Sequence, residues 1–455
     1  MPTRKNAPKR SGGSLVTRIE VDDLFHTYSY RLELTPTPEP YSGKLMLLYG
    51  NNGSGKTTIL NLLYHLLHPE PYGSHRSFVG SIPFKMFRVH LLDGLVVTAS
   101  RSRHSEIGGY EVTVEDAKRR IDIKWQWRSK QTRPERGVDA EYEKFCSFLR
   151  DLGFSFHYLR DTRRVEGTRV SDRQAALRRR LLISHEQALS LEGIEDEQEL
   201  FSPDQLLTAS LESFMQWFRQ HALLATNVGY TSVNTIYRDI IKRIVAAGTS
   251  PDETHHSDKA GLVRELLGLK EKNRVFAQLG LTPELDVKDI ITDLKSAKPR
   301  HLSMLNTVLR PYLEGHAARL DALNELQQVI NSFVALLSSF YSHKKATVHL
   351  EKGLSLRADT GQELDPANLS SGEKQLLLLF CNAISSRQNK TVLMIDEPEI
   401  SLNVRWQREL IPALLTCMSG TAFQIVIATH SVELLARYRD CVTPLHSNQE
   451  IDLHE

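Results

Sequence analysis

One eight-residue segment constrains this chain more than any other, "GNNGSGKT", Gly50 to Thr57. It matches G-x-x-x-x-G-K-[ST], with a strand pattern before it and helical apolar spacing from Lys56 onward. Glycines let such a loop wrap a phosphate, the helix N-terminus faces the anion, and the lysine reaches the β- and γ-phosphates. The segment therefore predicts a nucleotide-phosphate site, with Thr57 as a Mg²⁺ ligand, formed by Gly50, Asn51, Asn52, Gly53, Ser54, Gly55, Lys56, Thr57 and Thr58.

Three polar residues follow two buried-strand patterns near the end of the sequence. "TVLMIDEPE" places Asp396 and Glu397 after a nearly continuous apolar run, and "FQIVIATHS" places His430 after another. Such runs are typical of buried parallel strands. Asp396 is predicted to hold Mg²⁺, Glu397 to polarise a water for attack on a γ-phosphate, and His430 to contact that phosphate. Each feature is weak alone, but with the phosphate loop they predict a nucleoside triphosphatase.

A third motif, "LSSGEKQLLLLF", runs from a turn of small residues directly into an apolar helix. The S-x-x-E spacing of Ser370 and Glu373 predicts a capping box at the start of that helix. Small residues also permit close approach of the main chain to an anion at the helix N-terminus. The residues alone assign no ligand to this turn, which is formed by Ser370, Ser371, Gly372 and Glu373.

The ordered set "GNNGSGKT", "LSSGEKQ", "TVLMIDEPEISLN" and "IATHS" resembles the nucleotide-binding head of ABC-type ATPases, specifically the branch of SMC-like and OLD-like proteins. The resemblance implies that ATP and Mg²⁺ bind, and that the signature loop at Ser370–Gly372 completes the site of a second copy. It also implies that the loop from Ser401 to Asn403 crosses the dimer interface. The resemblance covers about a third of the chain, at its two ends.

The sequence departs from this family pattern in two places. A glutamine that senses Mg²⁺ and water cannot be placed, because "FHYLRDTRR" carries Asp161, Arg163 and Arg164 in the corresponding region but no glutamine. An aromatic residue for stacking on adenine is also not evident. Tyr28 and Tyr30 are candidates, although alternating strand residues are usually part of a core.

The patterning predicts an α/β fold with an antiparallel β arm and an inserted, mainly helical subdomain, and the resemblance implies that the α/β part is a P-loop ABC-type ATPase head. Residues 1–13 are expected to be a disordered basic tail. The head is expected to combine residues 14–170 with residues 342–455. The second range carries the signature turn, the strand that ends at Asp396 (Walker B) and the switch histidine, His430. Residues 171–341 are charged, Leu-rich and helical in period, so they are expected to form an insertion for oligomerisation or partner docking.

Composition narrows the class of protein. The net charge of +2 gives no general argument for nucleic-acid binding, which stays possible but unproven. Four scattered cysteines form no metal-ligand pattern and fit a reducing compartment. No apolar run reaches the roughly 18 residues of a membrane span, and no secretory signal is evident, so a cytoplasmic protein without a membrane partner is expected.

Three functional classes stay open at this point. The first is the ATPase subunit of a two-component antiphage defence system, resembling the PARIS or Septu type, which dimerises around ATP and controls a separate effector such as a nuclease. About 25 residues follow His430, too few for an effector domain. The second is a DNA repair or recombination ATPase of the SMC-like class, although long heptad arms are absent. The third is the ATP-binding subunit of a transporter, which the long insertion disfavours.

Overall fold

The computed structural model describes most of the chain, namely residues 15–34, 41–70, 75–101, 109–116, 121–127, 140–159, 165–167, 203–246, 259–387, 390–400 and 402–445. The chain divides into two compact units. The first contains residues 1–210 and 370–455, and the second contains residues 211–369. The predicted basic tail, residues 171–202 of the predicted insertion, and Asp161, Arg163, Arg164 and Ser401 lie outside the described residues.

A six-stranded sheet is the base of the first unit. Its strand order is β15 (Val442–Pro444), β3 (Leu45–Tyr49), β14 (Phe423–Thr429), β13 (Lys390–Asp396), β8 (Phe154–Leu159) and β9 (Val165–Gly167). All neighbours are parallel except β8 and β9. The central strands are buried almost throughout, as their continuous apolar sequences predict. This order places β14 between the strand that precedes the phosphate loop and the strand that ends at Asp396.

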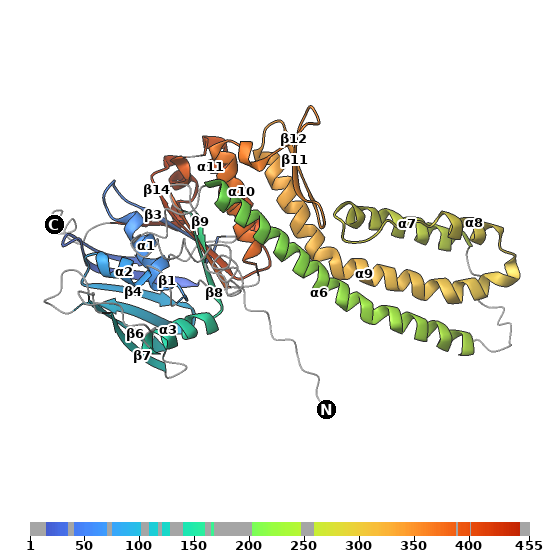
Figure 1. Cartoon of the computed structure of the whole chain (residues 1–455), viewed down its shortest axis with the longest axis horizontal. Coiled ribbons are helices and arrows are strands. Elements are labelled where there is room, and N and C mark those ends of the chain that lie inside the picture. Colours follow the sequence, from blue (N-terminus) through green and yellow to red (C-terminus); the bar gives the residue numbers. More distant parts are fainter. Residues whose placement is uncertain are drawn as a thin grey trace, which may run out of the picture. The chain divides into compact units, whose positions relative to one another are not determined.

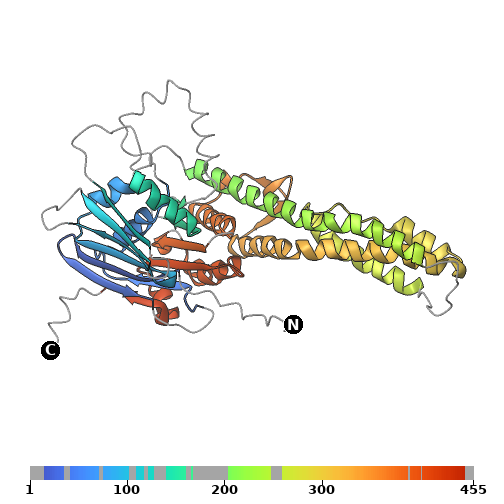
Figure 2. The same ribbon diagram turned by 90° about the horizontal axis from the view of Figure 1, so that it is seen from below.

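The second sheet of this unit is antiparallel. Its order is β2 (Tyr28–Glu33), β1 (Val16–Leu24), β4 (Met86–Leu91), β5 (Leu95–Ser100), β6 (Tyr110–Asp116) and β7 (Ile121–Trp127). Burial along β4 alternates between buried and half-buried positions, which is the pattern of a sheet with one covered face. Figure 2 shows these strands fanning out in blue and teal. The predicted antiparallel β arm is confirmed, and β4 to β7 form it as a meander of consecutive antiparallel strands.

The core of the first unit contains residues from both sheets. It includes the apolar faces of α1 (Lys56–Leu66) and α3 (Ala140–Asp151), and α2 (His75–Ser81) packs beside α1. A buried side chain also joins the sheets directly. The Gln424 amide on β14 accepts from the Val16 N–H at 2.7 Å and donates to the Val16 carbonyl at 2.8 Å. Gln424 thereby satisfies both main-chain groups of Val16, as a neighbouring strand would.

The remaining helices of this unit follow the motifs near the end of the chain. They are α10 (Ser371–Ser385), α11 (Val404–Cys417) and α12 (Val432–Arg437), and a short 3₁₀ turn, Pro398–Ile400, directly follows Glu397. Asn403 caps α11 by accepting from the Trp406 N–H, and Ser431 caps α12 by accepting from the Leu434 N–H. Each cap fixes where a helix begins relative to the strand end before it.

The second unit is mainly helical (Figure 1). It contains most of α6 (Pro203–Ala246), together with α7 (Lys259–Gln278), α8 (Lys288–Ser296) and α9 (Pro299–Phe340). Phe214 of α6 and Phe333 of α9 are fully buried, with ring centroids 4.6 Å apart. A small sheet of β10 (Lys344–His349), β11 (Gly353–Ala358) and β12 (Glu363–Leu364) packs beside α9. This unit therefore runs to Leu369, whereas the sequence predicted an insertion from 171 to 341.

These elements confirm the predicted fold class, a mixed α/β protein with a parallel sheet, an antiparallel sheet and a helical insertion between the two ends of the chain. None of the helices within the described ranges combines the length and the apolar character that crossing a bilayer requires.

Candidate nucleotide-binding site

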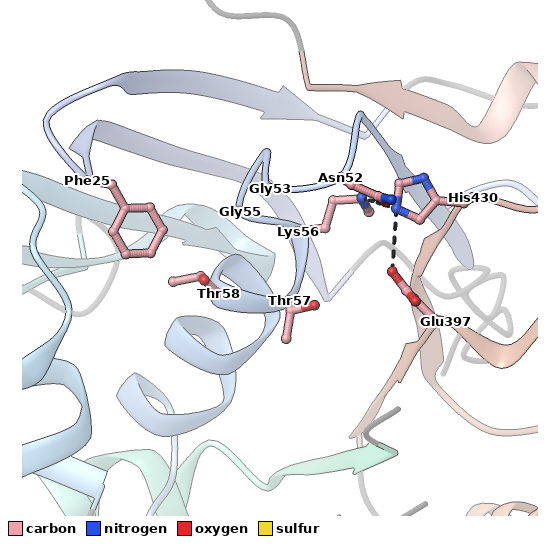
Figure 3. Close-up of a pocket in the computed structure, with 9 residues that line it drawn as sticks. All are labelled: Phe25, Asn52, Gly53, Gly55, Lys56, Thr57, Thr58, Glu397 and His430. Atoms are coloured by element: carbon pink, nitrogen blue, oxygen red, sulfur yellow. Dashed lines mark hydrogen bonds and ion pairs between the residues drawn. The ribbon is translucent and has the colours of Figure 1, made fainter. Parts of the chain in front are cut away.

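A pocket of about 250 Å³ lies where β3 leads into α1. Figure 3 shows Lys56, His430 and Glu397 close together at one side of it, with Phe25 on the opposite side of Gly55. The pocket therefore joins residues from both ends of the sequence. Its lining residues are Phe25, Asn52, Gly53, Gly55, Lys56, Thr57, Thr58, Glu397 and His430.

The phosphate loop has a main-chain shape that depends on glycine. Gly53 and Gly55 have φ values of 82° and 88°, in the left-handed region that other residues rarely adopt. A Cβ at Gly50 would lie 2.7 Å from Ser54 Oγ, which is too close. The hydroxyl of Tyr30 on β2 donates to the Ser54 carbonyl at 3.0 Å. The loop is therefore held in the shape that turns successive main-chain N–H groups toward an anion.

Lys56 is the central cation of the pocket, and only 4% of its surface is exposed. Its ammonium donates to the carbonyls of Gly50 at 3.0 Å and Asn51 at 3.1 Å, and lies 2.6 Å from His430 Nε2. An ammonium has three donors and no acceptor, so Nε2 of His430 is the acceptor in the contact with Lys56. Burial lowers the pKa of Lys56, while nearby carboxylates, Glu397 foremost, oppose that shift.

Glu397 reaches the pocket through an uncommon main-chain conformation. Its φ of 45° is in the left-handed region, where a glutamate is strained. Its N–H donates to the Ala428 carbonyl at 2.9 Å, so it stays attached to β14 beyond the end of β13. The carboxylate lies 3.4 Å from His430 Nε2. The fold therefore places the two side chains predicted to be catalytic next to each other.

Asp396, the predicted metal ligand, is completely buried at the end of β13. The hydroxyl of Tyr158 on β8 donates to Asp396 Oδ2 at 3.3 Å. Sequence reasoning missed Tyr158, although it lies in the segment "FHYLRDTRR", where a glutamine was expected.

Phe25 is a second pocket residue that sequence reasoning missed. It lies in the turn between β1 and β2, and Asp23 near the end of β1 together with Phe25 and His26 in the turn have φ between 54° and 58°. Three non-glycine residues in this conformation make a strained turn, a feature that concentrates at functional sites. The Phe25 N–H donates to the Pro83 carbonyl at 3.0 Å, and 38% of the residue is exposed. The turn therefore presents an aromatic ring beside Gly55.

The two tyrosines suggested for base stacking have other positions. Tyr28 and Tyr30 stack on each other, with ring centroids 5.7 Å apart and an interplanar angle of 13°. Tyr30 is buried, and neither residue lines the pocket. Phe25, which lies nearby in sequence, is the better candidate for contact with a base.

The signature residues form the predicted capping box. Ser370 Oγ accepts from the Glu373 N–H at 3.4 Å, and the Glu373 carboxylate accepts from the Ser370 N–H at 2.9 Å. Ser370 and Ser371 are exposed, whereas Gly372 and Glu373 are buried. None of these four residues lines the described pocket. The structure thus gathers the phosphate loop, Glu397 and His430 around one pocket and leaves the signature turn outside it.

The residues present fit a nucleoside triphosphate with Mg²⁺. The loop glycines, the start of α1 and the buried Lys56 provide donors and positive charge for phosphates. The described residues include no group of three or more His, Cys, Asp or Glu that could hold a metal ion. Mg²⁺ commonly binds through one or two protein oxygens together with substrate phosphates, so one carboxylate and one hydroxyl suit this ion.

A family model described as "AAA domain, putative AbiEii toxin, Type IV TA system" matches residues 238–436, less than half of the chain. The matched range includes the signature turn, the strand that ends at Asp396, and His430, but not the phosphate loop. The match therefore concerns the C-terminal part of the site.

Curated relatives include ATP-binding proteins of import systems. The hemin import ATP-binding protein HmuV of Vibrio parahaemolyticus is 28% identical over 204 residues, 42% of this chain and 74% of the relative. The molybdenum import ATP-binding protein ModC of a Shewanella species, strain MR-4, is 34% identical over 86 residues, 19% of this chain. The match spans 23% of the length of that second relative.

Among solved structures, the chain aligns with the Smc head domain of Pyrococcus furiosus that has an extended coiled coil and is bound to the C-terminal domain of ScpA. The alignment covers 96% of this chain and 98% of the other, with 12% identity and a TM-score of 0.36. The motifs, the sheet order and the curated relatives together support a P-loop ATPase of the ABC type.

Proposed function

We propose that this protein binds ATP with Mg²⁺, hydrolyses it, and uses the cycle to close and open a dimer that controls a separate effector. The observation that carries the proposal is the convergence of Lys56, His430 and Glu397 on one pocket from three neighbouring strand ends. In this proposal the phosphate loop and Thr58 cradle the phosphates, and Phe25 contacts the base. Thr57 and Asp396 would hold Mg²⁺, which would neutralise negative charge on the phosphates.

Hydrolysis is assigned to the strand-end residues. Glu397 accepts a proton from the attacking water and orients that water in line with the γ-phosphate. Lys56 exchanges its contacts with Gly50 and Asn51 for phosphate oxygens, so that the charge of the ammonium opposes the charge that develops during transfer. His430 contacts the γ-phosphate and, with Nε2 toward Lys56, holds the neighbouring side chains in place. Main-chain strain at Glu397 favours one orientation of this carboxylate over the alternatives.

The proposed dimer follows from the position of the signature turn. Ser370 and Ser371 are exposed at the start of α10 and do not line the pocket of their own chain. The helix start and the small residues suit an anion presented from outside, which is the contact expected with the γ-phosphate held by a second copy. Closing a dimer from about 1% to about 99% populated requires roughly 5.5 kcal/mol of differential binding, which two shared nucleotides can supply.

The proposed control of an effector rests on the division of the chain into two units rather than on a single contact. Among the described residues of the second unit, residues 211–369, none lines the pocket, and we assign this unit to oligomerisation or partner docking. The description of the matching family refers to an AbiEii toxin and a type IV TA system, and we carry it over as support for a defence role. An antiphage switch of the PARIS or Septu type, acting on a separate nuclease, is the proposal that combines these features.

A transporter subunit is the second candidate, favoured by the resemblance to HmuV over 74% of that protein. The inserted unit opposes it, because an ATP-binding subunit of a transporter has no evident use for a mainly helical insertion of this size. A repair ATPase of the SMC-like class fits the same motifs. Co-purification with a nuclease, a membrane permease or DNA separates the three.

The test is the mass of Glu397→Gln in solution, measured by light scattering on a sizing column with and without ATP and Mg²⁺. The variant retains the phosphate loop but lacks the carboxylate that accepts the proton, so it should bind ATP, hydrolyse it slowly and accumulate as a dimer. Ser371→Arg, added to the same variant, should abolish the ATP-dependent increase in mass. Near-normal turnover by Glu397→Gln would refute the role of Glu397, and a mass indifferent to ATP would refute the ATP-dependent dimer.

A further inference from the structure

A third acidic residue of the "DEPE" segment makes contacts that its neighbours do not make. Glu399 lies in the 3₁₀ turn after β13, and its carboxylate accepts from the end of β14. Thr429 Oγ1 lies 2.9 Å from both carboxylate oxygens, and the main-chain N–H of His430 donates to Glu399 Oε1. Glu399 therefore forms hydrogen bonds with Thr429 and with the main chain of His430, and these bonds fix the main-chain position from which the His430 side chain extends.

The network continues in a consistent donor-to-acceptor direction. The Ser431 N–H donates to Thr429 Oγ1 at 2.9 Å, so the Thr429 hydroxyl proton is available for Glu399. Ser431 Oγ donates to Gln407 Oε1 at 2.8 Å, and the Gln407 amide donates to the carbonyls of Glu399 and Leu402. Thr429, Ser431 and Gln407 are buried. The turn after Glu397 is thus tied to the segment around His430 through both the side chain and the carbonyl of Glu399.

The chemistry of this site selects for an ionised carboxylate. Two donors, one hydroxyl and one main-chain N–H, converge on the Glu399 side chain, and a carboxylate offers acceptors on both oxygens. Thr429 and His430 both donate to Oε1, and only Thr429 also contacts Oε2. A glutamine would keep one acceptor oxygen, lack the negative charge that strengthens both hydrogen bonds, and place its NH₂ group beside Thr429 Oγ1. An aspartate is shorter by one methylene and would not reach both donors from the same main-chain position.

The geometry points to Glu399 as a positioning residue that fixes His430 between Lys56 and Glu397. His430 makes its contacts of 2.6 Å with Lys56 and 3.4 Å with Glu397 through a single nitrogen. Its main chain must therefore be held accurately, and Glu399 bonds to the N–H of that residue. The expected effect of Glu399 on turnover rests on the proposed ATPase function, whereas its effect on the position of His430 does not.

The test compares kcat and KM for ATP in Glu399→Gln, Thr429→Val and Thr429→Ser. Loss of a residue that orients another typically costs roughly 10- to 100-fold in activity, so the first two variants should lose that much kcat. KM for ATP should stay within about twofold, because the phosphate loop is unchanged. Thr429→Ser keeps the hydroxyl and should retain wild-type turnover. A kcat of Glu399→Gln within about twofold of wild type would overturn the inference.

Two controls separate this role from a structural one. Glu433→Gln removes another carboxylate that joins α11 to α12, through the exposed pair with Arg408 at 2.7 Å, and should leave kcat unchanged. In Glu399→Gln, a clearly lower unfolding temperature together with a higher KM would mean that the lower kcat reflects general destabilisation. That result would overturn the inference.

A second measurement does not require turnover. The imidazole NMR signals of His430, assigned by their loss in His430→Ala, should move in Glu399→Gln and stay in place in Thr429→Ser. Unchanged signals in Glu399→Gln would overturn the inference. Absence of ATP hydrolysis by the wild-type protein would refute the proposed function alone, and the NMR comparison would still decide the position of His430.

Discussion

Lys56 Nζ and His430 Nε2 lie 2.6 Å apart, although 374 positions separate these residues in the sequence. The contact exists because β3 and β14 are parallel neighbours, so the loop after one strand meets the loop after the other. Burial lowers the pKa of Lys56, and the nearby carboxylates of Glu397, Asp396 and Glu399 partly offset that shift by favouring the charged form. A buried cation among acceptors on one side of an open pocket is prepared to bind an anion.

Replacing Lys56 with alanine should weaken ATP binding about 100-fold, because hydrogen bonds to charged groups contribute roughly 1.5–3 kcal/mol. Titration with a fluorescent ATP analogue measures the change. Lys85→Ala is the matched control, since the Lys85 side chain is 62% exposed and pairs with Asp22 outside the pocket. Unchanged affinity in Lys56→Ala would undo the assignment of the phosphate loop.

Tyr158→Phe should raise the Mg²⁺ concentration needed for half-maximal ATPase activity by roughly tenfold, since residues that orient metal ligands commonly affect affinity by about 10- to 100-fold. The change removes the hydroxyl that donates to Asp396 Oδ2 at 3.3 Å and keeps the buried ring. Binding of ATP without Mg²⁺ should not change. If the Mg²⁺ dependence of Tyr158→Phe equals that of wild type, the hydroxyl has no part in holding Asp396.

Phe25→Ala should weaken ATP binding roughly tenfold, because stacking of a base on an aromatic ring contributes about 1–3 kcal/mol. Inorganic tripolyphosphate has no base, so its competition for the site should be the same in both proteins. His26→Ala changes the exposed neighbour of Phe25 in the same turn and serves as the control. Equal losses for ATP and tripolyphosphate would mean that the substitution distorts the phosphate loop instead.

The histidines at the end of α1 predict a loss of stability in acid. His68 is 4% exposed and stacks on His75 with ring centroids 3.7 Å apart. Burial, followed by the neighbouring His75 and His65, holds the pKa of His68 well below 6.5. The unfolded chain therefore binds a proton near pH 6.5 that the folded chain does not. Stability should fall as the pH drops below about 6.5, by up to about 1.4 kcal/mol per pH unit for this group.

Thermal unfolding between about pH 7.5 and about pH 5.0 measures this effect. His68→Phe keeps an aromatic ring without the titrating nitrogen, so its unfolding temperature should fall less with acid than that of the wild type. His301→Phe, at an exposed position, should retain the wild-type pH dependence. Identical pH dependence in His68→Phe and wild type would show that other groups cause the loss.

Much of the first unit could be predicted from local patterns. The glycines of residues 50–57 and the 3–4 spacing of apolar residues after Lys56 indicate the loop and the helix, because both depend on nearby residues. The capping box of Ser370 and Glu373 was predicted in the same way and is confirmed. The C-terminal boundary of the inserted unit could not be predicted in this way. The strands β10 and β11 pair with each other beside α9, and a strand pattern in the sequence does not show which unit the strand joins.

The sequence by itself determined the motifs and the residue types available for chemistry, since these are set by composition and spacing within a few residues. Tertiary structure decided which of them meet. Sheet order brings the strand end that carries His430 next to Lys56, and Tyr158 reaches Asp396 because β8 is the parallel neighbour of β13. Phe25 enters the pocket through a strained turn, and Glu399 bonds to the end of the next strand. Such contacts depend on the pairing of distant strands, which local spacing does not specify.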